Sequence, residues 1–256
     1  MQEIVQSIDR ALCIIEVLSD YENGLGISEI SEKVALHKST VHRLLNTLIY
    51  KGYIKQNPSN SKYSLTLKLF ELGYKKLAGM DLVTVARPYL NELMKEINEV
   101  VHLVIRDGFE IVYVAKVEPQ KSITMYSRIG MRKPLYCTAV GKAMMSYMSE
   151  SEINEIWNKS DITKLTEKTI VSYSQLKENL TEIREKGFAL DDQEVETGIR
   201  CVASVIKDHS NSVCAAISIS SSIFTFTEEK IDYYAKLIME YADKISAELG
   251  YKKQRK

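Results

Sequence analysis

The stretch from residue 37 to residue 54, HKSTVHRLLNTLIYKGYI, has the clearest local pattern in this chain. Its apolar residues recur with the i, i+3, i+4, i+7 spacing of an amphipathic helix: Val41, Leu44, Leu45 and Leu48. The opposite face carries only hydrogen-bonding side chains: Ser39, His42, Arg43, Asn46 and Thr47. Such a helix packs its apolar stripe on a core and leaves its polar face free to contact a partner.

This stretch and its surroundings are cationic, although the whole chain has 34 basic and 34 acidic residues. Residues 33–62 contain no Asp or Glu, whereas basic side chains occur throughout: Lys33, Lys38, Arg43, Lys51, Lys55 and Lys62. A polar, cationic helix face without acids suits the major groove of DNA. The alternative is a solvated surface helix that happens to lack acids.

The neighbouring segments predict a winged helix-turn-helix. We expect a first helix over residues 7–21, with one face traced by Ile8, Ala11, Leu12, Ile15, Leu18 and Ser19. A short helix over 28–34 and a turn at 35–37 lead into the cationic helix. Strands at 53–56 and 62–65 flank a run of turn residues and form a hairpin in the position of a wing. We therefore expect DNA contacts from Lys38, Ser39, Thr40, His42, Arg43, Asn46 and, on the wing, Lys62.

The chain of 256 residues is long enough for two domains. We expect a DNA-binding domain at 1–65, a linker helix at 66–79 and a second domain at 80–256. In the second domain we expect strands at 100–106, 111–117, 122–128, 201–206 and 213–220, and helices at 139–148, 151–158 and 174–186. Ser149 and Glu152 predict a capping box, and Thr227 is expected to cap a long last helix. Helices flanking a mainly antiparallel sheet make an α+β domain.

Several function classes find no support in the sequence. Four widely separated cysteines without a CxxC motif indicate reduced thiols, not a disulfide frame or a zinc site: Cys13, Cys137, Cys201 and Cys214. No GxSxG, P-loop or GxGxxG motif is present, so we expect no enzyme and no cofactor. No apolar run is long enough to span a bilayer. His102 is expected to be half-buried structure on a strand, not a catalytic base.

Three segments of the second domain are candidates for a ligand pocket. Ser218 and Ser220 share one face of a strand, which is either the floor of a pocket or the wet side of a half-exposed sheet. Ala139 and Val140 begin a helix with small residues, where backbone N–H groups attract an anion or small side chains merely aid packing. Asp191 lies in an acidic segment that is either a surface loop or a site for a polyol or a carboxyl group.

The motifs that follow one another along the chain resemble those of the IclR family of bacterial transcriptional regulators. The residues that carry this resemblance are SIDRAL at 7–12, KSTVHRLLNTL at 38–48, RIGMRKPLYCTAVGKAMM at 128–145, GFALDDQEVETGIRCVASVI at 187–206 and AAISIS at 215–220. They span nearly the whole chain in the family's order. His37 stands where the family often has proline.

The resemblance implies a winged helix joined by a linker helix to a GAF-like effector domain, in dimers or tetramers that bind palindromic operators. Family effectors are commonly small carboxylates, and their contacts map onto Ala139, Val140, Asp191, Cys201, Ser218 and Ser220, with Ser122 and Met125 on the wall. Ser122 is more polar than that wall usually is, which favours a hydroxylated acid over an aromatic one. Some members that sense 2-keto-3-deoxygluconate are similar around 125–130 and 134–143. We expect a cytoplasmic regulator of catabolic genes. Repressor and activator both remain open, and a repressor is the favoured interpretation. An enzyme with an accessory helical domain and a winged helix that binds protein remain the alternatives.

Overall fold

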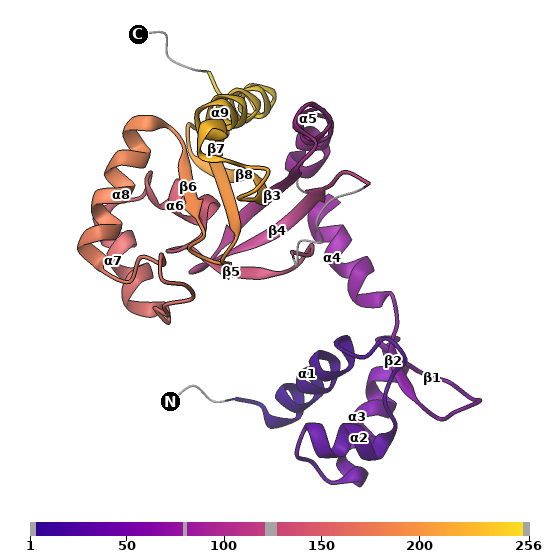
Figure 1. Cartoon of the computed structure of the whole chain (residues 1–256). Helices are drawn as coiled ribbons and strands as arrows, with labels where there is room; N and C mark the ends of the chain where they lie inside the picture. Colours follow the sequence, from indigo (N-terminus) through magenta and orange to yellow (C-terminus); the bar gives the residue numbers. More distant parts are fainter. Residues whose placement is uncertain (1–3, 79–80, 121–126, 253–256) are drawn as a thin grey trace. The chain divides into compact units, whose positions relative to one another are not determined.

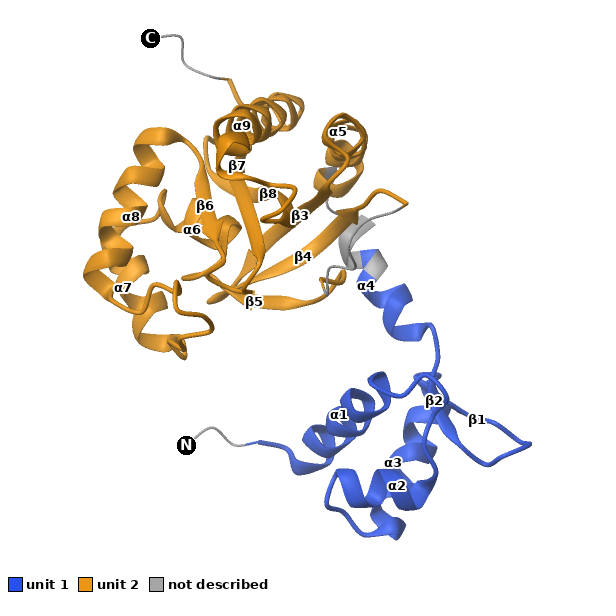
Figure 2. Cartoon of the chain, viewed as in Figure 1, with its two compact units in different colours: residues 1–79 blue, residues 80–256 orange. Residues whose placement is uncertain are grey.

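The computed structural model describes residues 4–78, 81–120 and 127–252 (Figure 1). The chain divides into two compact units, residues 1–79 and residues 80–256, called unit 1 and unit 2 below (Figure 2). The finer division of unit 1 into a DNA-binding domain and a linker helix stays a prediction. Among the described residues, no helix is long and apolar enough to cross a membrane.

Unit 1 is a winged helix-turn-helix followed by a further helix. Its helices are α1 (Gln6–Ser19), α2 (Ile27–Lys33), α3 (Lys38–Tyr50) and α4 (Lys68–Ala78), and its hairpin pairs β1 (Ile54–Gln56) with β2 (Tyr63–Leu65). The backbones of Tyr63 and Leu25 exchange hydrogen bonds of 2.8 and 3.0 Å, which fasten the hairpin to the turn after α1. Ile30, Val41, Leu45 and Ile54 meet in one apolar core. The helix order and the wing predicted from the sequence are confirmed.

The face expected for the first helix is only partly the buried one. Ile14 and Leu18 are buried, whereas Ile8 is 59% and Leu12 is 52% exposed. The period of the helix was predicted correctly, but its apolar stripe is wider than the core that unit 1 supplies. Two apolar side chains of α1 are therefore left on the surface.

Unit 2 is built on an antiparallel sheet with helices on both faces. Its described strands are β3 (Val100–Asp107), β4 (Glu110–Val117), β5 (Arg132–Pro134), β6 (Ala189–Asp192), β7 (Ile199–Lys207) and β8 (Val213–Ser222). They form a six-stranded sheet in the order β5-β4-β3-β8-β7-β6, so that β5 and β6 are the edges. The antiparallel pairing along the whole sheet confirms the α+β class.

Two groups of helices cover this sheet (Figure 1). On one face lie α5 (Asp81–Ile97) and α9 (Ile231–Glu248), which contact each other and the central strands. On the other face lie α6 (Ala139–Met145), α7 (Glu150–Lys159) and α8 (Tyr173–Lys186). The apolar core of this second layer joins Leu135 and Met144 to Ile156, Leu180 and other buried side chains. The capping box of Ser149 and Glu152 at the start of α7 is confirmed.

Four expectations for unit 2 need correction or fall outside the described residues. Of the strand expected at 122–128, residues 122–126 are not described, Ser127 and Arg128 are not in a strand, and the strand beside β4 is β5. The segment around Asp191 is the edge strand β6, since it pairs with β7. Thr227 makes no side-chain cap; it precedes a short 3-10 helix (Glu228–Lys230), and α9 begins only at Ile231. The helix expected over 139–148 is shorter than predicted: it ends at Met145, and Ser146 is its C-cap residue.

Candidate functional site

Helix α3 is held by its apolar stripe and presents its polar face to solvent. Val41 and Leu45 are fully buried and Leu48 nearly so, and they pack in the core that α1 and α2 complete. The exposed side chains of α3 include most of the predicted DNA contacts: Lys38, Ser39, His42, Arg43 and Asn46. Thr40 is half-buried, because it lies at the border of the buried stripe. The geometry thus gives a partner free access to the face that the sequence singled out.

Further side chains of α3 and of the wing also lie exposed or partly exposed. The Asn46 amide and the His42 ring lie 3.4 Å apart, one helical turn from each other. Tyr50, near the end of α3, is 85% exposed, and the sequence reasoning did not single it out. On the wing, Lys62 is half-buried next to β2, while Lys55 on β1 is exposed. Both lysines remain free of neighbouring acids along the chain between residues 33 and 62.

Unit 2 contains a cavity of about 320 Å³ between the sheet and the layer of α6. Every strand of the described sheet contributes at least one lining residue, from Lys133 on the edge strand β5 to Asp191 on the edge strand β6. The cavity also touches the start of α6, through Thr138, Ala139 and Val140. Its size and its mixture of apolar walls and polar groups are typical of a site for a small molecule.

Polar side chains from four adjacent strands meet at the floor of the cavity. In the register of the sheet, His102 of β3 lies opposite Ser218 of β8, and Ser220 of β8 lies opposite Cys201 of β7. The next pair, Cys201 with Asp191 of β6, continues the same row. Because residues paired across antiparallel strands share a face, these side chains all point to the cavity. Ser218 and Ser220 are therefore buried polar groups and not the wet side of an exposed sheet.

His102 is the centre of the polar network at this floor. Its Nε2 atom lies 2.8 Å from the Ser127 hydroxyl, and its Nδ1 atom lies 3.4 Å from each of the Ser218 and Ser220 hydroxyls. The ring of Tyr113 contacts it edge-on at 5.0 Å. Burial, with a smaller effect of the Lys116 charge, lowers the pKa of His102 to about 3, so the ring is neutral at physiological pH. A neutral ring both donates and accepts a hydrogen bond, which suits the recognition of hydroxyl groups.

Asp191 is a buried carboxyl group in the cavity wall. Only 4% of the residue is exposed, and its Oδ1 accepts the Glu194 backbone N–H at 2.7 Å. Burial and the nearby charge of Glu194 raise the pKa of Asp191 from 3.8 to about 7. The alternative of a surface acidic loop is wrong for this residue, because β6 carries it under α6.

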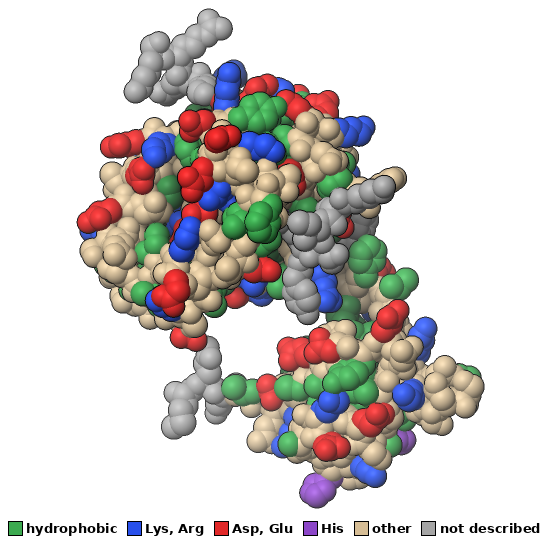
Figure 3. All heavy atoms as spheres, viewed as in Figure 1, with side chains coloured by type: hydrophobic (Ala, Val, Ile, Leu, Met, Phe, Trp, Pro, Cys, Tyr) green, Lys and Arg blue, Asp and Glu red, His purple; other side chains and the backbone are tan. Residues whose placement is uncertain are grey.

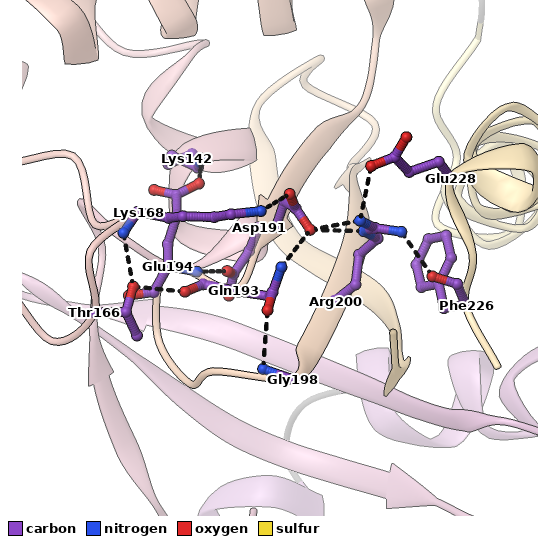
Figure 4. A network of polar contacts seen from close by, with 11 residues as sticks. Lys142, Thr166, Lys168, Asp191, Gln193, Glu194, Gly198, Arg200, Phe226 and Glu228 are labelled. Atoms are coloured by element: carbon purple, nitrogen blue, oxygen red, sulfur yellow. Dashed lines mark hydrogen bonds and ion pairs between the residues drawn. The ribbon is translucent and has the colours of Figure 1, made fainter. Parts of the chain in front are cut away.

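A buried ion pair lies next to Asp191. Lys142 of α6 and Glu194, both almost fully buried, form an ion pair that Figure 4 shows beside Asp191. Thr169 donates a hydrogen bond of 2.6 Å to the Glu194 carbonyl oxygen, and Arg200 pairs with Asp192 at 2.7 Å. These contacts fasten the segment after β6, which supplies Val195 and Glu196 to the cavity, to the body of unit 2.

Comparisons with known proteins identify the family. Residues 74–247 match the model of the bacterial transcriptional regulator IclR C-terminal domain, and residues 7–58 match the IclR helix-turn-helix domain. The chain belongs to the IclR family of bacterial transcriptional regulators. This family is one of regulators and not of enzymes, which sets aside the enzyme alternative.

The similarity extends over the whole chain. The HTH-type transcriptional regulator KdgR of Escherichia coli is 39% identical over 247 residues, covering 96% of this chain and 94% of the relative. XynR of the same organism is 37% identical, covering 97% and 98%. The crystal structure of Thermotoga maritima IclR superimposes with a TM-score of 0.84 at 35% identity, covering 97% of this chain and all of that one. The predicted family, including its KdgR-type subgroup, is confirmed.

The structure brings together most of the residues predicted to bind the effector. Ala139, Val140, Asp191, Cys201, Ser218 and Ser220 all line the one cavity. Ser122 and Met125 lie outside the described residues. Burial raises the pKa of the Cys201 thiol, which is therefore neutral and unreactive.

Nine described lining residues were not among the predicted effector contacts: His102, Tyr113, Ser127, Met131, Lys133, Thr138, Val195, Glu196 and Ile199. The sequence predicted that His102 lies on a strand. That this strand pairs with β8, so that His102 lies opposite Ser218, is seen only in the structure.

The raised pKa of Asp191 predicts how pH changes stability. Between pH 4 and 7 the unfolded chain ionises this carboxyl group, whereas the folded chain keeps its proton, with a pKa of about 7 against 3.8. The unfolded state therefore binds fewer protons, and stability from this group falls as the pH rises through that range and is constant above it. We expect the free energy of unfolding of the wild type, minus that of Asp191→Asn, to fall between pH 4 and 7 in urea titrations. A difference that does not change with pH contradicts the assignment.

Proposed function

We propose that this IclR-family chain is a repressor of catabolic genes in the bacterial cytoplasm, released or retained on its operator by a small carboxylate. The observation that carries the proposal is the polar floor of the cavity in unit 2, where His102, Ser218, Ser220 and Asp191 converge from three different strands. Such convergence of buried polar groups in an enclosed space favours a hydroxylated or oxo-bearing ligand.

The proposed effector is an oxo acid or a sugar acid. The similarity to KdgR supports the sugar-acid subgroup, and the several hydroxyl groups of the cavity match a hydroxylated chain. We propose that Ala139, Val140, Asp191, Cys201, Ser218 and Ser220 contact the effector, with Ser122 and Met125 on the wall. Asp191 favours a ligand anion only when it is protonated, which its pKa of about 7 allows near neutrality.

The proposed target is double-stranded DNA with a palindromic operator. The exposed face of α3 enters the major groove, where bases and phosphates are contacted by Ser39, Thr40, His42, Arg43 and Asn46. Lys38 at the start of α3 and Lys62 on the wing bind phosphates. Related regulators are named as repressors, among them YiaJ of Escherichia coli, which is 34% identical. A ligand changes operator affinity only if it binds two arrangements of the protein with different affinity.

The proposed assembly is a homodimer or a homotetramer. Figure 3 shows hydrophobic side chains on the surface of unit 1. The exposed apolar residues on α1 and at α4 include Ile8, Leu12, Leu67, Phe70 and Leu72. Monomeric proteins rarely expose apolar residues in such a group, and a second copy would bury them. A two-fold axis between two α3 helices matches inverted half-sites.

The effector proposal is tested by a thermal-shift screen with pyruvate, 4-hydroxybenzoate and 2-keto-3-deoxygluconate on the full chain. We expect at least one acid to raise the melting temperature of the wild type. We expect Ser218→Ala combined with Ser220→Ala to abolish this shift, because the variant loses two hydroxyl groups at the cavity floor, and to leave operator binding intact.

Ser221→Ala is the matched control, since Ser221 is a buried serine on the same strand whose side chain faces away from the cavity. It should keep the wild-type shift. Equal shifts in the wild type and the double variant would remove these serines from the site, and no shift with any acid would contradict the effector class.

A further inference from the structure

We infer that Lys133 binds the carboxylate of the effector and thereby selects acids over neutral sugars of the same shape. This inference rests on the proposed effector site and adds a residue that the sequence pattern did not indicate. Lys133 lies on the edge strand β5, is half-buried and lines the cavity. Lys133 lies within the family-like segment RIGMRKPLY but was not among the predicted effector contacts.

The backbone of Lys133 is held in place on both sides. Lys133 lies opposite Ile111 of β4, a fully buried residue, so its side chain starts on the inner face of the sheet. Before it, the Tyr113 N–H donates to the Met131 carbonyl oxygen at 3.1 Å. After it, the Thr138 hydroxyl donates to the Pro134 carbonyl oxygen at 3.0 Å. Lys133 thus lines the cavity from a strand whose neighbouring residues are hydrogen-bonded on both sides.

Lys133 is the one permanent cation among the lining residues that the structure describes. His102 is neutral, because burial lowers its pKa to about 3. Other lysines near the cavity are already paired: Lys116 with Glu118 at 2.7 Å, and Lys142 with Glu194. Within the described residues, no acid forms an ion pair with Lys133, so its charge is available to a ligand.

The charges of the cavity also orient a ligand with a single carboxylate. Lys133 lines the cavity from one edge strand, whereas Asp191 on the opposite edge strand and Glu196 in the segment after it supply carboxyl groups. An ionised carboxyl group repels an anion. The carboxylate is thus directed to the Lys133 side. The oxo and hydroxyl groups are directed to the floor, where Ser218, Ser220 and the neutral His102 ring offer donors and acceptors.

Calorimetric titration of the full chain with 2-keto-3-deoxygluconate and with its primary amide tests the inference. The amide has nearly the same shape but no charge. We expect Lys133→Met to weaken binding of the acid by roughly 10- to 150-fold, as for loss of one hydrogen bond to a charged group, and to leave the affinity for the amide unchanged. Lys133→Gln should behave in the same way.

Arg132→Met is the matched control, because it removes an equal charge from the next residue, whose guanidinium pairs with Asp107 and Glu110 away from the cavity. It should leave both affinities unchanged. Equal affinity of Lys133→Met and the wild type for the acid would overturn the inference, as would an equal loss for acid and amide. Failure of the wild type to bind the acid would overturn the sugar-acid effector itself, and this inference with it.

Discussion

Lys142→Met is expected to lower the free energy of unfolding of unit 2 by about 3–5 kcal/mol. Lys142 is 1% exposed, and the substitution leaves the Glu194 carboxyl group buried without its counter-charge. The Oε2 atom of Glu194 already has no hydrogen-bond partner among the described residues. Burial raises the pKa of Glu194, so protonation relieves part of the loss, and the defect should shrink as the pH falls. Urea unfolding followed by tryptophan fluorescence measures it through Trp157.

Two further variants separate the lost partner from a simple change of packing. Lys142→Met combined with Glu194→Gln removes both charges and should recover much of the lost stability. Lys159→Met breaks the exposed pair with Glu155 at 2.7 Å and should cost about 1 kcal/mol or less. A loss for Lys142→Met as small as that for Lys159→Met would mean that the buried pair does not hold the cavity wall.

Arg43→Ala is expected to reduce affinity for the operator by about 1–3 kcal/mol and to relax sequence preference at one base pair of each half-site. We expect this effect because the Arg43 guanidinium is exposed on α3 and has the fork geometry for a bidentate contact with guanine. Gel-shift titration against the DNA upstream of the protein's own gene, at two salt concentrations, measures both effects.

Lys62→Ala provides the contrast. A wing lysine that contacts phosphate should weaken binding to specific and random DNA alike and make the salt dependence shallower, because fewer counterions are released. Unchanged affinity in Arg43→Ala would argue against this docking of α3. Absence of binding to any DNA would favour the alternative that the winged helix binds protein.

The winged helix-turn-helix could be predicted almost completely from the sequence. Its helices depend on contacts between near neighbours, and the spacing of Val41, Leu45 and Leu48 already names the side that is buried. The exception is α1, where Ile8 and Leu12 belong to the apolar face but are not covered by the described core of unit 1. The spacing of apolar residues identifies the apolar face of a helix. It does not show which parts of that face will be buried by the rest of the domain.

The cavity could be predicted only in part. The motifs around Ala139, Asp191 and Ser218 named residues that do meet at one place. Because side chains alternate between the two faces of a strand, the sequence shows that Ser218 and Ser220 share a face. It does not show which strand lies beside them. His102 is 116 positions away from Ser218 along the chain, and only the pairing of β3 with β8 makes them neighbours.

The family, the class of fold, the exposed polar side of α3 and several residues that line one cavity could thus be predicted from the sequence alone. The electrostatics of that cavity could not be predicted, because they depend on the folded chain: Asp191 is buried with a pKa of about 7, His102 is neutral, and Lys133 is a lining residue. The physical reason is that helical periodicity is a property of adjacent residues. Burial and charge pairing depend instead on which distant strands and helices come together around a side chain.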